Sequence, residues 1–291
     1  MSDLQSIDSD DGAWQVRSSA MSAEIMAGSW PSPKAGDDKY SRGVVGIDTG
    51  SPRYLGAAVL STLGVLRSGA GFIRFAGSQE AVPAVLARCP SVTVGAGRVN
   101  AWVVGCGWDD DEDNAERLAT RLADGLPCVI DAGALWVIDD ALERLGWAAL
   151  PTNCLLTPHA GEMARLLGVT RADVTDDPLH RTAQLSQRYG ASALLKGATQ
   201  YCVGPSGEMA GSAAIVEVYR ALPGPAWTAQ AGSGDVLAGV AGALLAGGVV
   251  APLAGALAAS LQALTATRHL GPWAPDQLAD WFPETIAGFS G

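Results

Sequence analysis

The sequence predicts an α/β fold in which a mostly parallel central sheet carries helices on both faces. From residue 44 onward, short apolar runs of about four to six residues alternate with longer stretches of helical periodicity. Apolar strands separated by helices are typical of parallel sheets that are covered on both sides. No repeat or internal linker interrupts this pattern after residue 40, so we expect a single domain over residues 41–291.

The expected elements follow one another along the whole of that domain. Strands are predicted at residues 43–48, 71–75, 101–105, 127–131, 153–157, 192–196 and 201–204. Helices are predicted at residues 54–69, 79–88, 112–124, 134–145, 160–168, 178–189, 235–247, 252–268 and 275–287. Residues 201–218 are typical of a hairpin that turns at Gly204–Gly207. Residues 1–40 lack apolar periodicity and predict a loosely ordered lead-in with a short helix near Met21–Met26.

Composition and charge restrict the class of protein. Acidic residues number 30 against 19 basic ones, and the net charge of −11 argues against a nucleic-acid-binding protein. The uncharged stretch over residues 236–264 is long enough to span a membrane, but Gly247, Gly248 and Pro252 interrupt it, so two buried helices are expected. The five cysteines form no CxxC pair, and the acidic N-terminus is not a secretory signal. These features predict a cytoplasmic protein without a membrane segment.

A phosphate site is indicated where small residues precede an apolar helix. Gly232, Ser233 and Gly234 place backbone N–H groups at the start of the helix, where the helix dipole also favours an anion. Asp235 in the first turn is positioned to take a proton from a hydroxyl that attacks the phosphate. The alternative is a glycine turn in which Asp235 only starts the helix. No Walker A loop occurs in the chain.

Three further segments place chemistry-bearing residues at the ends of predicted elements. In Thr157–Met163, Glu162 would hold a hydrated Mg²⁺ and His159 a ligand; alternatively, Thr157 caps a helix that starts at Pro158. Lys196 and Gly197 end a predicted strand, where they suit contact with a phosphate or a ribose. The alternative is a strand end that is only exposed to solvent. The small residues Gly56–Ala58 at a predicted helix start would let a flat ligand ring approach the backbone. The alternative is that they allow close packing of the helix against the sheet. The acids of Asp109–Asp113 complement a helix dipole and lack the spacing of a calcium loop.

Taken together and in order, these segments resemble the NAD(P)H-hydrate dehydratases of the ribokinase-like superfamily. The matching segments are Lys39–Gly43, Gly56–Leu60, Arg67–Gly71, Leu156–Glu162, Leu195–Gly197 and Ala231–Gly239. The resemblance covers nearly the whole chain and implies a ribokinase-like fold. It also implies repair of NADH or NADPH hydrated at C6 of the nicotinamide ring. Bacterial members use ADP and release AMP and phosphate, whereas eukaryotic members use ATP.

The resemblance assigns roles to residues of this chain. Asp235 would be the catalytic residue that activates the substrate hydroxyl, and Mg²⁺ would bind Glu162 through water. The hydrate would contact Ala57 or Ala58, Gly107, His159 and Asp235. The nucleotide would contact Lys196, Gly197, Ala198, Thr199, Gln200, Gly232, Ser233 and Gly234. Members tend to form homo-oligomers, often tetramers, and the S epimer is their substrate, so a separate epimerase, or spontaneous epimerisation, is expected to convert the other epimer.

The chain departs from the family pattern at three places, and two other functions stay open. Family members often have His-Lys in place of Asp38-Lys39, Gly-Pro-Gly in place of Gly105–Gly107, and Asp-Ala-Asp in place of Asp131–Gly133. A kinase of the same fold for a hydroxymethylpyrimidine- or thiazole-type alcohol would share Asp235 but leave phosphate on its product. A nucleotide-binding protein without catalysis is the other alternative.

Overall fold

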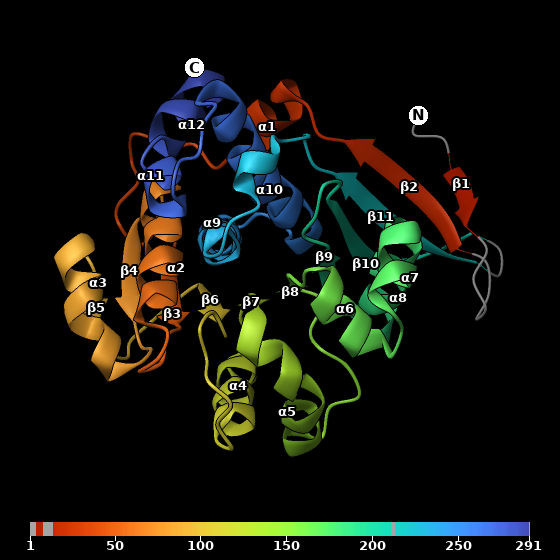
Figure 1. Ribbon diagram of the computed structural model, residues 1–291, viewed down its shortest axis with the longest axis horizontal. Helices are drawn as coiled ribbons and strands as arrows, with labels where there is room; N and C mark the ends of the chain where they lie inside the picture. The colour runs from red at the N-terminus through yellow and green to blue at the C-terminus, as the bar shows by residue number, and fades with distance from the viewer. Residues whose placement is uncertain (1–3, 8–13, 211–212, 291) are drawn as a thin grey trace.

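A single mixed sheet forms the centre of the computed structural model, which describes residues 4–7, 14–210 and 213–290. Its eleven strands lie in the order β1-β2-β11-β10-β9-β8-β7-β6-β3-β4-β5 (Figure 1). The strands are β1 (Leu4–Ile7), β2 (Trp14–Ala20), β3 (Val44–Asp48), β4 (Phe72–Phe75), β5 (Thr93–Val94), β6 (Ala101–Val104), β7 (Cys128–Ile130), β8 (Cys154–Leu156), β9 (Ser192–Leu194), β10 (Tyr201–Ala210) and β11 (Ala213–Arg220).

Helices cover both faces of this sheet. They are α1 (Ala23–Ser29), α2 (Leu55–Arg67), α3 (Val82–Arg88), α4 (Asn114–Ala123), α5 (Ile138–Leu145), α6 (Ala160–Leu167), α7 (Arg171–Asp176), α8 (Pro178–Tyr189), α9 (Ser233–Ala246), α10 (Ala251–Arg268), α11 (Pro275–Ala279) and α12 (Phe282–Ser290). Three short 3-10 turns add η1 (Gln79–Ala81), η2 (Ala132–Val137) and η3 (Ala226–Thr228). The predicted helix over 275–287 is therefore divided into α11 and α12.

Most neighbouring strands are parallel. All pairs from β5 to β9 run parallel, as do β11 and β2. The pairs β9–β10, β10–β11 and β1–β2 are antiparallel. The predicted fold class, an α/β fold with a mostly parallel sheet, is thus confirmed.

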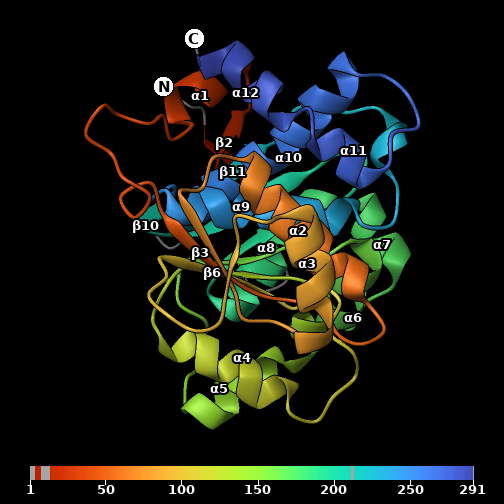
Figure 2. The same cartoon turned by 90° about the vertical axis from the view of Figure 1, so that its left-hand side faces the viewer.

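Side chains alternate between two cores on opposite faces of the sheet. Val45 and Val103 pack in the core beneath α2, α9 and α10, whereas Val44 and Val104 pack with α4, α5 and α6. Figures 1 and 2 show these two helical layers above and below the strands. Since successive side chains of a strand point to opposite faces, a sheet covered on both sides requires apolar residues at nearly every strand position.

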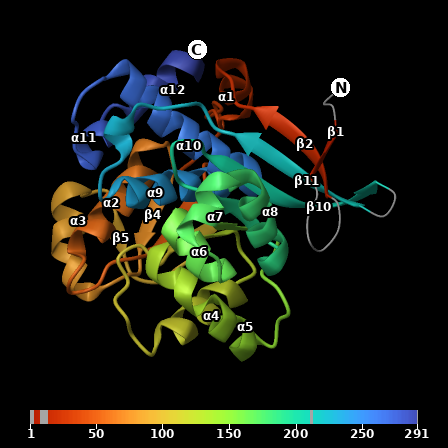
Figure 3. The ribbon, with the colours of Figure 1, turned by 45° about the vertical axis from the view of Figure 1, so that its right-hand side comes forward.

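The N-terminal segment differs from its prediction. The expectation of a loosely ordered lead-in over residues 1–40 is wrong for residues 14–30, because β2 pairs in parallel with β11 (Figure 3). The short helix expected near Met21–Met26 is present as α1, with Met26 fully buried and Trp30 in edge-to-face contact with Phe289. The hydrogen bonds that order β2 come from a strand about 200 residues away. The domain boundary at residue 41 stays a prediction.

The hairpin over β10 and β11 is confirmed, but its predicted turn is misplaced. Strand β10 continues through Gly204–Gly207 to Ala210, with an irregular register between Pro205 and Met209. The two residues that join the strands, 211–212, lie outside the described residues.

The uncharged stretch over residues 236–264 forms the buried helices α9 and α10, as expected. In the part of the chain that the structure describes, no helix is both long and apolar enough to cross a membrane. Helices α2 and α9 approach closely, because a Cβ on Gly239 would lie 2.1 Å from the carbonyl oxygen of Ser61. This contact holds the middle of α9 against the middle of α2.

Candidate active site

The carboxyl ends of the central strands and the start of α9 meet at one edge of the sheet. Cys106 follows β6, Asp131 follows β7 and Asp235 lies in the first turn of α9. Their ligand atoms, one sulfur and two carboxylate oxygens, all lie within 4.8 Å of one another. In open parallel sheets, ligands bind at this edge. The structure therefore brings the predicted catalytic residue to the expected place.

A buried ion pair lies at the centre of this group. The Lys196 Nζ lies 2.6 Å from Oδ1 of Asp131, whose side chain is 2% exposed. A Cβ on Gly234 would lie 3.1 Å from the same Nζ, so the ammonium sits against the start of α9. Lys196 also hydrogen-bonds through its backbone N–H to the carbonyl oxygen of Pro158, at 2.9 Å. One lysine thus links β7, the segment after β8 and α9.

Burial and like charges make the acids of this group more basic than usual. Burial, followed by the charge of Asp131, raises the pKa of Asp235 to about 6, although Lys196 acts in the opposite direction. Burial likewise raises the pKa of Glu162. For Lys196, burial favours loss of the proton, but Asp131 and Glu162 outweigh it and raise its pKa. Asp235 is therefore ionised at neutral pH yet basic enough for general-base catalysis.

The start of α6 differs from the alternative considered for it. His159, rather than Thr157, is the N-cap residue, and the helix begins at Ala160. The Nδ1 of His159 accepts hydrogen bonds from the backbone N–H groups of Gly161 and Glu162, at 3.0 and 3.1 Å. In turn, the backbone N–H of His159 donates a hydrogen bond to Oε2 of Glu162, at 2.8 Å. Reciprocal capping of this kind fixes the His159 ring, whose Nε2 lies 3.6 Å from Oε1 of Glu162.

Two cavities lie on either side of this group. The first cavity, of about 510 Å³, is lined by Ala57, Gly107, Glu162 and Asp235 among others. The second cavity, of about 420 Å³, is lined by His159, Lys196, Gly197, Ala198, Gln200, Ser233 and Gly234 among others. Both volumes suit a small ligand. Since Asp235 faces the first cavity and Ser233 and Gly234 face the second, the first turn of α9 separates two ligand-sized spaces.

Three of the predicted site residues lie outside both cavities. Ala58 is fully buried, so of the two alanines predicted to contact the hydrate only Ala57 faces the first cavity. Thr199 lines a smaller neighbouring space. Gly232 is the N-cap of α9 with φ 92°, and a Cβ there would lie 2.6 Å from Leu60. His159 was predicted to contact the hydrate but lines the second cavity. The roles of all these residues stay predictions.

The fold leaves no room for a side chain at Gly107. Its φ is 67°, and a Cβ there would lie 2.5 Å from the Cβ of Ala57 and 2.9 Å from that of Tyr54. The loop after β6 thereby approaches the start of α2 closely.

In the first cavity, the carboxylate oxygens of Glu162 and Asp235 are the type of donor that Mg²⁺ prefers, so the lining fits the predicted metal.

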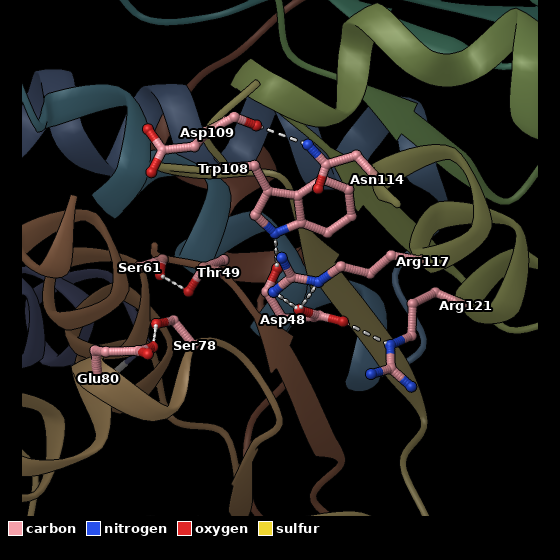
Figure 4. A network of polar contacts seen from close by, with 10 residues as sticks. All are labelled: Asp48, Thr49, Ser61, Ser78, Glu80, Trp108, Asp109, Asn114, Arg117 and Arg121. Atoms are coloured by element: carbon pink, nitrogen blue, oxygen red, sulfur yellow. Dashed lines mark hydrogen bonds and ion pairs between the residues drawn. The ribbon is translucent and has the colours of Figure 1, made fainter. Parts of the chain in front are cut away.

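A polar network behind the first cavity was not predicted from the sequence (Figure 4). Asp48 is completely buried at the end of β3 and pairs with Arg117 and Arg121 of α4. The Trp108 indole N–H donates to the Asp48 carbonyl oxygen at 2.9 Å, and the Arg117 guanidinium lies 4.2 Å from the Trp108 ring. Trp108 lines the first cavity. The network therefore holds one wall of that cavity in place.

Two further residues that line the first cavity were also missed. Arg165 of α6 and Trp136 of η2 both line it, with the guanidinium 4.1 Å from the ring centroid. Arg165 lies three residues after Glu162, and residues three apart share a helix face. That spacing was the signal available in the sequence.

The sequence matches known proteins over most of its length. A family model described as NAD(P)H-hydrate dehydratase matches residues 45–277. A bifunctional NAD(P)H-hydrate repair enzyme of Mycobacterium tuberculosis is 42% identical over 226 residues, which are 76% of this chain and 44% of the relative. An ADP-dependent (S)-NAD(P)H-hydrate dehydratase of Neisseria meningitidis is 33% identical over 215 residues, 70% of each chain. This chain thus spans less than half the length of the first of these relatives.

A solved structure shares the fold over nearly the whole chain. It is an ADP/ATP-dependent NAD(P)H-hydrate dehydratase from Bacillus subtilis, co-crystallised with ATP and Mg²⁺. Its TM-score is 0.77 at 23% sequence identity, with 92% of this chain and 97% of that chain covered. A ribokinase-like superfamily protein of Enterococcus faecalis matches with a TM-score of 0.78 at 20% identity, over 94% of this chain and 96% of that chain, which confirms the ribokinase-like fold.

Proposed function

Because the chain belongs to the NAD(P)H-hydrate dehydratase family, we propose that it dehydrates the S epimer of NADH or NADPH hydrate with ADP as the phosphoryl donor. The products are NAD(P)H, AMP and phosphate. The observation that supports this proposal most strongly is the position of Asp235, which faces a cavity of about 510 Å³ beside the amide-rich start of α9. A second ligand-sized space lies on the other side of the same helical turn.

The ring hydroxyl of the hydrate is a poor leaving group, and phosphorylation makes it a good one. Asp235 accepts the hydroxyl proton while the hydroxyl oxygen bonds to the terminal phosphorus of ADP, and AMP leaves as the P–O bond to its phosphate breaks. The C6–O bond of the phosphorylated ring then breaks, phosphate departs, and loss of a C5 proton restores the ring double bond. Atoms and charges balance without any further reactant.

The residues around Asp235 divide the remaining work. Ala57 and Gly107 leave room for the flat ring, and the backbone amides of Ser233 and Gly234 stabilise charge on the transferring phosphoryl group. Lys196, Gly197, Ala198 and Gln200 hold the nucleotide in the second cavity, and Thr199 would contact it from the neighbouring space. His159 lines the same cavity, where its side chain would hydrogen-bond to the substrate or its phosphoryl group.

Mg²⁺ is expected to accompany the nucleotide, with Glu162 holding it through water. Bound to the phosphates, Mg²⁺ would neutralise part of their negative charge. ATP as an alternative donor, homotetrameric assembly, a cytoplasmic location and a separate epimerase partner all stay predictions.

A coupled assay tests the proposed function. NADH hydrate is incubated with the protein, Mg²⁺ and either ADP or ATP, and nicotinamide absorbance and free phosphate are followed together. Recovery of one NADH per phosphate, with AMP formed from ADP, is the expected result. Consumption of nucleotide without recovery of NADH, or no reaction with an authentic hydrate, would contradict the proposal; an alcohol kinase would instead form a phosphorylated product.

A further inference from the structure

Arg165 and Trp136 form a pair in the wall of the first cavity that the reaction at Asp235 does not use. The Arg165 guanidinium lies over the Trp136 ring, with its central carbon 4.1 Å from the ring centroid. Trp136 is 36% exposed, which is high for a tryptophan, and Arg165 is also exposed. A guanidinium stacked on an aromatic ring is held in one plane while its N–H groups stay available at the edge.

Arg165 is the one cation among the residues that line the first cavity. The lining otherwise contains the acids Asp109, Asp110, Glu162 and Asp235. Within the described part of the chain, no carboxylate oxygen lies within 4.0 Å of the Arg165 guanidinium, although most other arginines near the site are paired with acids. An anionic ligand that enters this acidic cavity therefore meets its attractive charge at Arg165.

The pair lies about one helical turn along α6 and η2 from two other residues that line the first cavity. Arg165 follows Glu162 by three residues on α6, and Trp136 follows Gly133 by three residues on η2. Glu162 and Gly133 both line the cavity. A step of three residues in an α-helix corresponds to a rise of about 4.5 Å. Arg165 is thus set apart from Glu162 along α6 in the same cavity wall, where it can contact a part of the substrate other than the reacting ring.

We propose that Arg165, held flat against Trp136, binds a phosphate of the dinucleotide substrate at a distance from the reacting ring. This inference rests on the proposed function, since NADH hydrate carries a pyrophosphate and NADPH hydrate carries an additional 2′-phosphate. Arginine binds phosphate oxygens through two parallel N–H donors, and its planar group matches them in shape. The ring of Trp136 positions the arginine and does not itself contact the reacting atoms.

The variant Arg165→Gln tests this proposal, with Arg144→Gln as the matched control. Arg144 carries the same charge on α5, pairs with Glu116 and does not line the first cavity. We expect Arg165→Gln to raise KM for the hydrate about tenfold with little change in kcat, which corresponds to the loss of about 1.4 kcal/mol of charged hydrogen bonding. Trp136→Leu is expected to raise KM by a smaller factor and Trp136→Phe to restore it, whereas Arg144→Gln leaves KM unchanged.

The two substrates identify the phosphate. An equal rise in KM for NADH hydrate and NADPH hydrate assigns Arg165 to the pyrophosphate, and a rise confined to NADPH hydrate assigns it to the 2′-phosphate. An unchanged KM for both substrates would overturn the inference.

Binding of the product NADH, measured by titration calorimetry without nucleotide, separates this inference from the proposed function. Lack of turnover by the wild-type protein would contradict the proposed function alone. An NADH affinity of Arg165→Gln within twofold of the wild-type value, or no NADH binding by the wild type, would overturn the role of Arg165.

Discussion

Asp235→Asn is predicted to make the protein more stable at neutral pH while it removes the catalytic base. Burial and the charge of Asp131 raise the pKa of Asp235 from an ordinary value of 3.8 to about 6. A carboxyl with a raised pKa in the folded state disfavours folding once it is ionised. The protonated Asp235 carboxyl carries no such penalty. The stability of the folded state is therefore unaffected by Asp235 below pH 3.8 and falls as the pH rises through about 6. A shift of about two pKa units corresponds to about 3 kcal/mol.

The favourable interaction of the Asp235 charge with the start of α9 offsets part of this cost, by about 0.3–1 kcal/mol. We therefore expect Asp235→Asn to raise the free energy of unfolding by about 2 kcal/mol near pH 8 and to change it little near pH 4. Urea denaturation followed by circular dichroism measures both values. Asp140→Asn removes an exposed acid from the first turn of α5 and is the control. It is expected not to raise the free energy of unfolding at either pH. A destabilised Asp235→Asn protein near pH 8, or a gain independent of pH, would contradict the destabilising effect assigned to the Asp235 charge.

Three further predictions follow from the same geometry. Asp48→Asn removes a completely buried charge from its two partly buried arginine partners and is expected to cost about 2–4 kcal/mol in urea denaturation. Glu116→Gln, at an exposed pair, is expected to cost less than about 0.5 kcal/mol, and equal effects would contradict the role of burial. Gly107→Ala places a Cβ 2.5 Å from that of Ala57 at φ 67° and should cost about 1–2 kcal/mol in thermal denaturation and raise KM for the hydrate. The kcat/KM of the wild type should fall about tenfold per pH unit below about pH 6, as Asp235 becomes protonated, and a flat profile down to pH 5 would exclude that assignment.

The central strands were predictable because each is buried on both faces. Val44 and Val45 point to opposite cores, so the run after Gly43 is apolar throughout and carries a clear signal. Strand β2 was missed for the opposite reason. It contains polar residues such as Arg17, and its order depends on hydrogen bonds to β11, a partner that no local pattern reveals.

Within the site, local patterns identified Asp235 and Lys196 but not what surrounds them. Each follows or precedes glycine at the end of an apolar element, which is a feature of neighbouring residues in the chain. Lys196 and Asp131 are 65 positions apart in the chain. They pair because the strand order β9-β8-β7 places them on opposite sides of β8. The contact between Asp48 and Arg117, 69 positions apart, depends on the packing of α4 in the same way.

The role of Asp235 is tested by measuring Asp235→Asn in the coupled assay with NADH hydrate, ADP and Mg²⁺, together with ADP binding by titration calorimetry. General-base catalysis contributes about 10²–10⁴-fold to rate, so kcat is predicted to fall by at least about 100-fold while the affinity for ADP stays within a few-fold of the wild-type value. Release of phosphate and recovery of NADH at close to the wild-type rate would contradict the claim that Asp235 takes the proton.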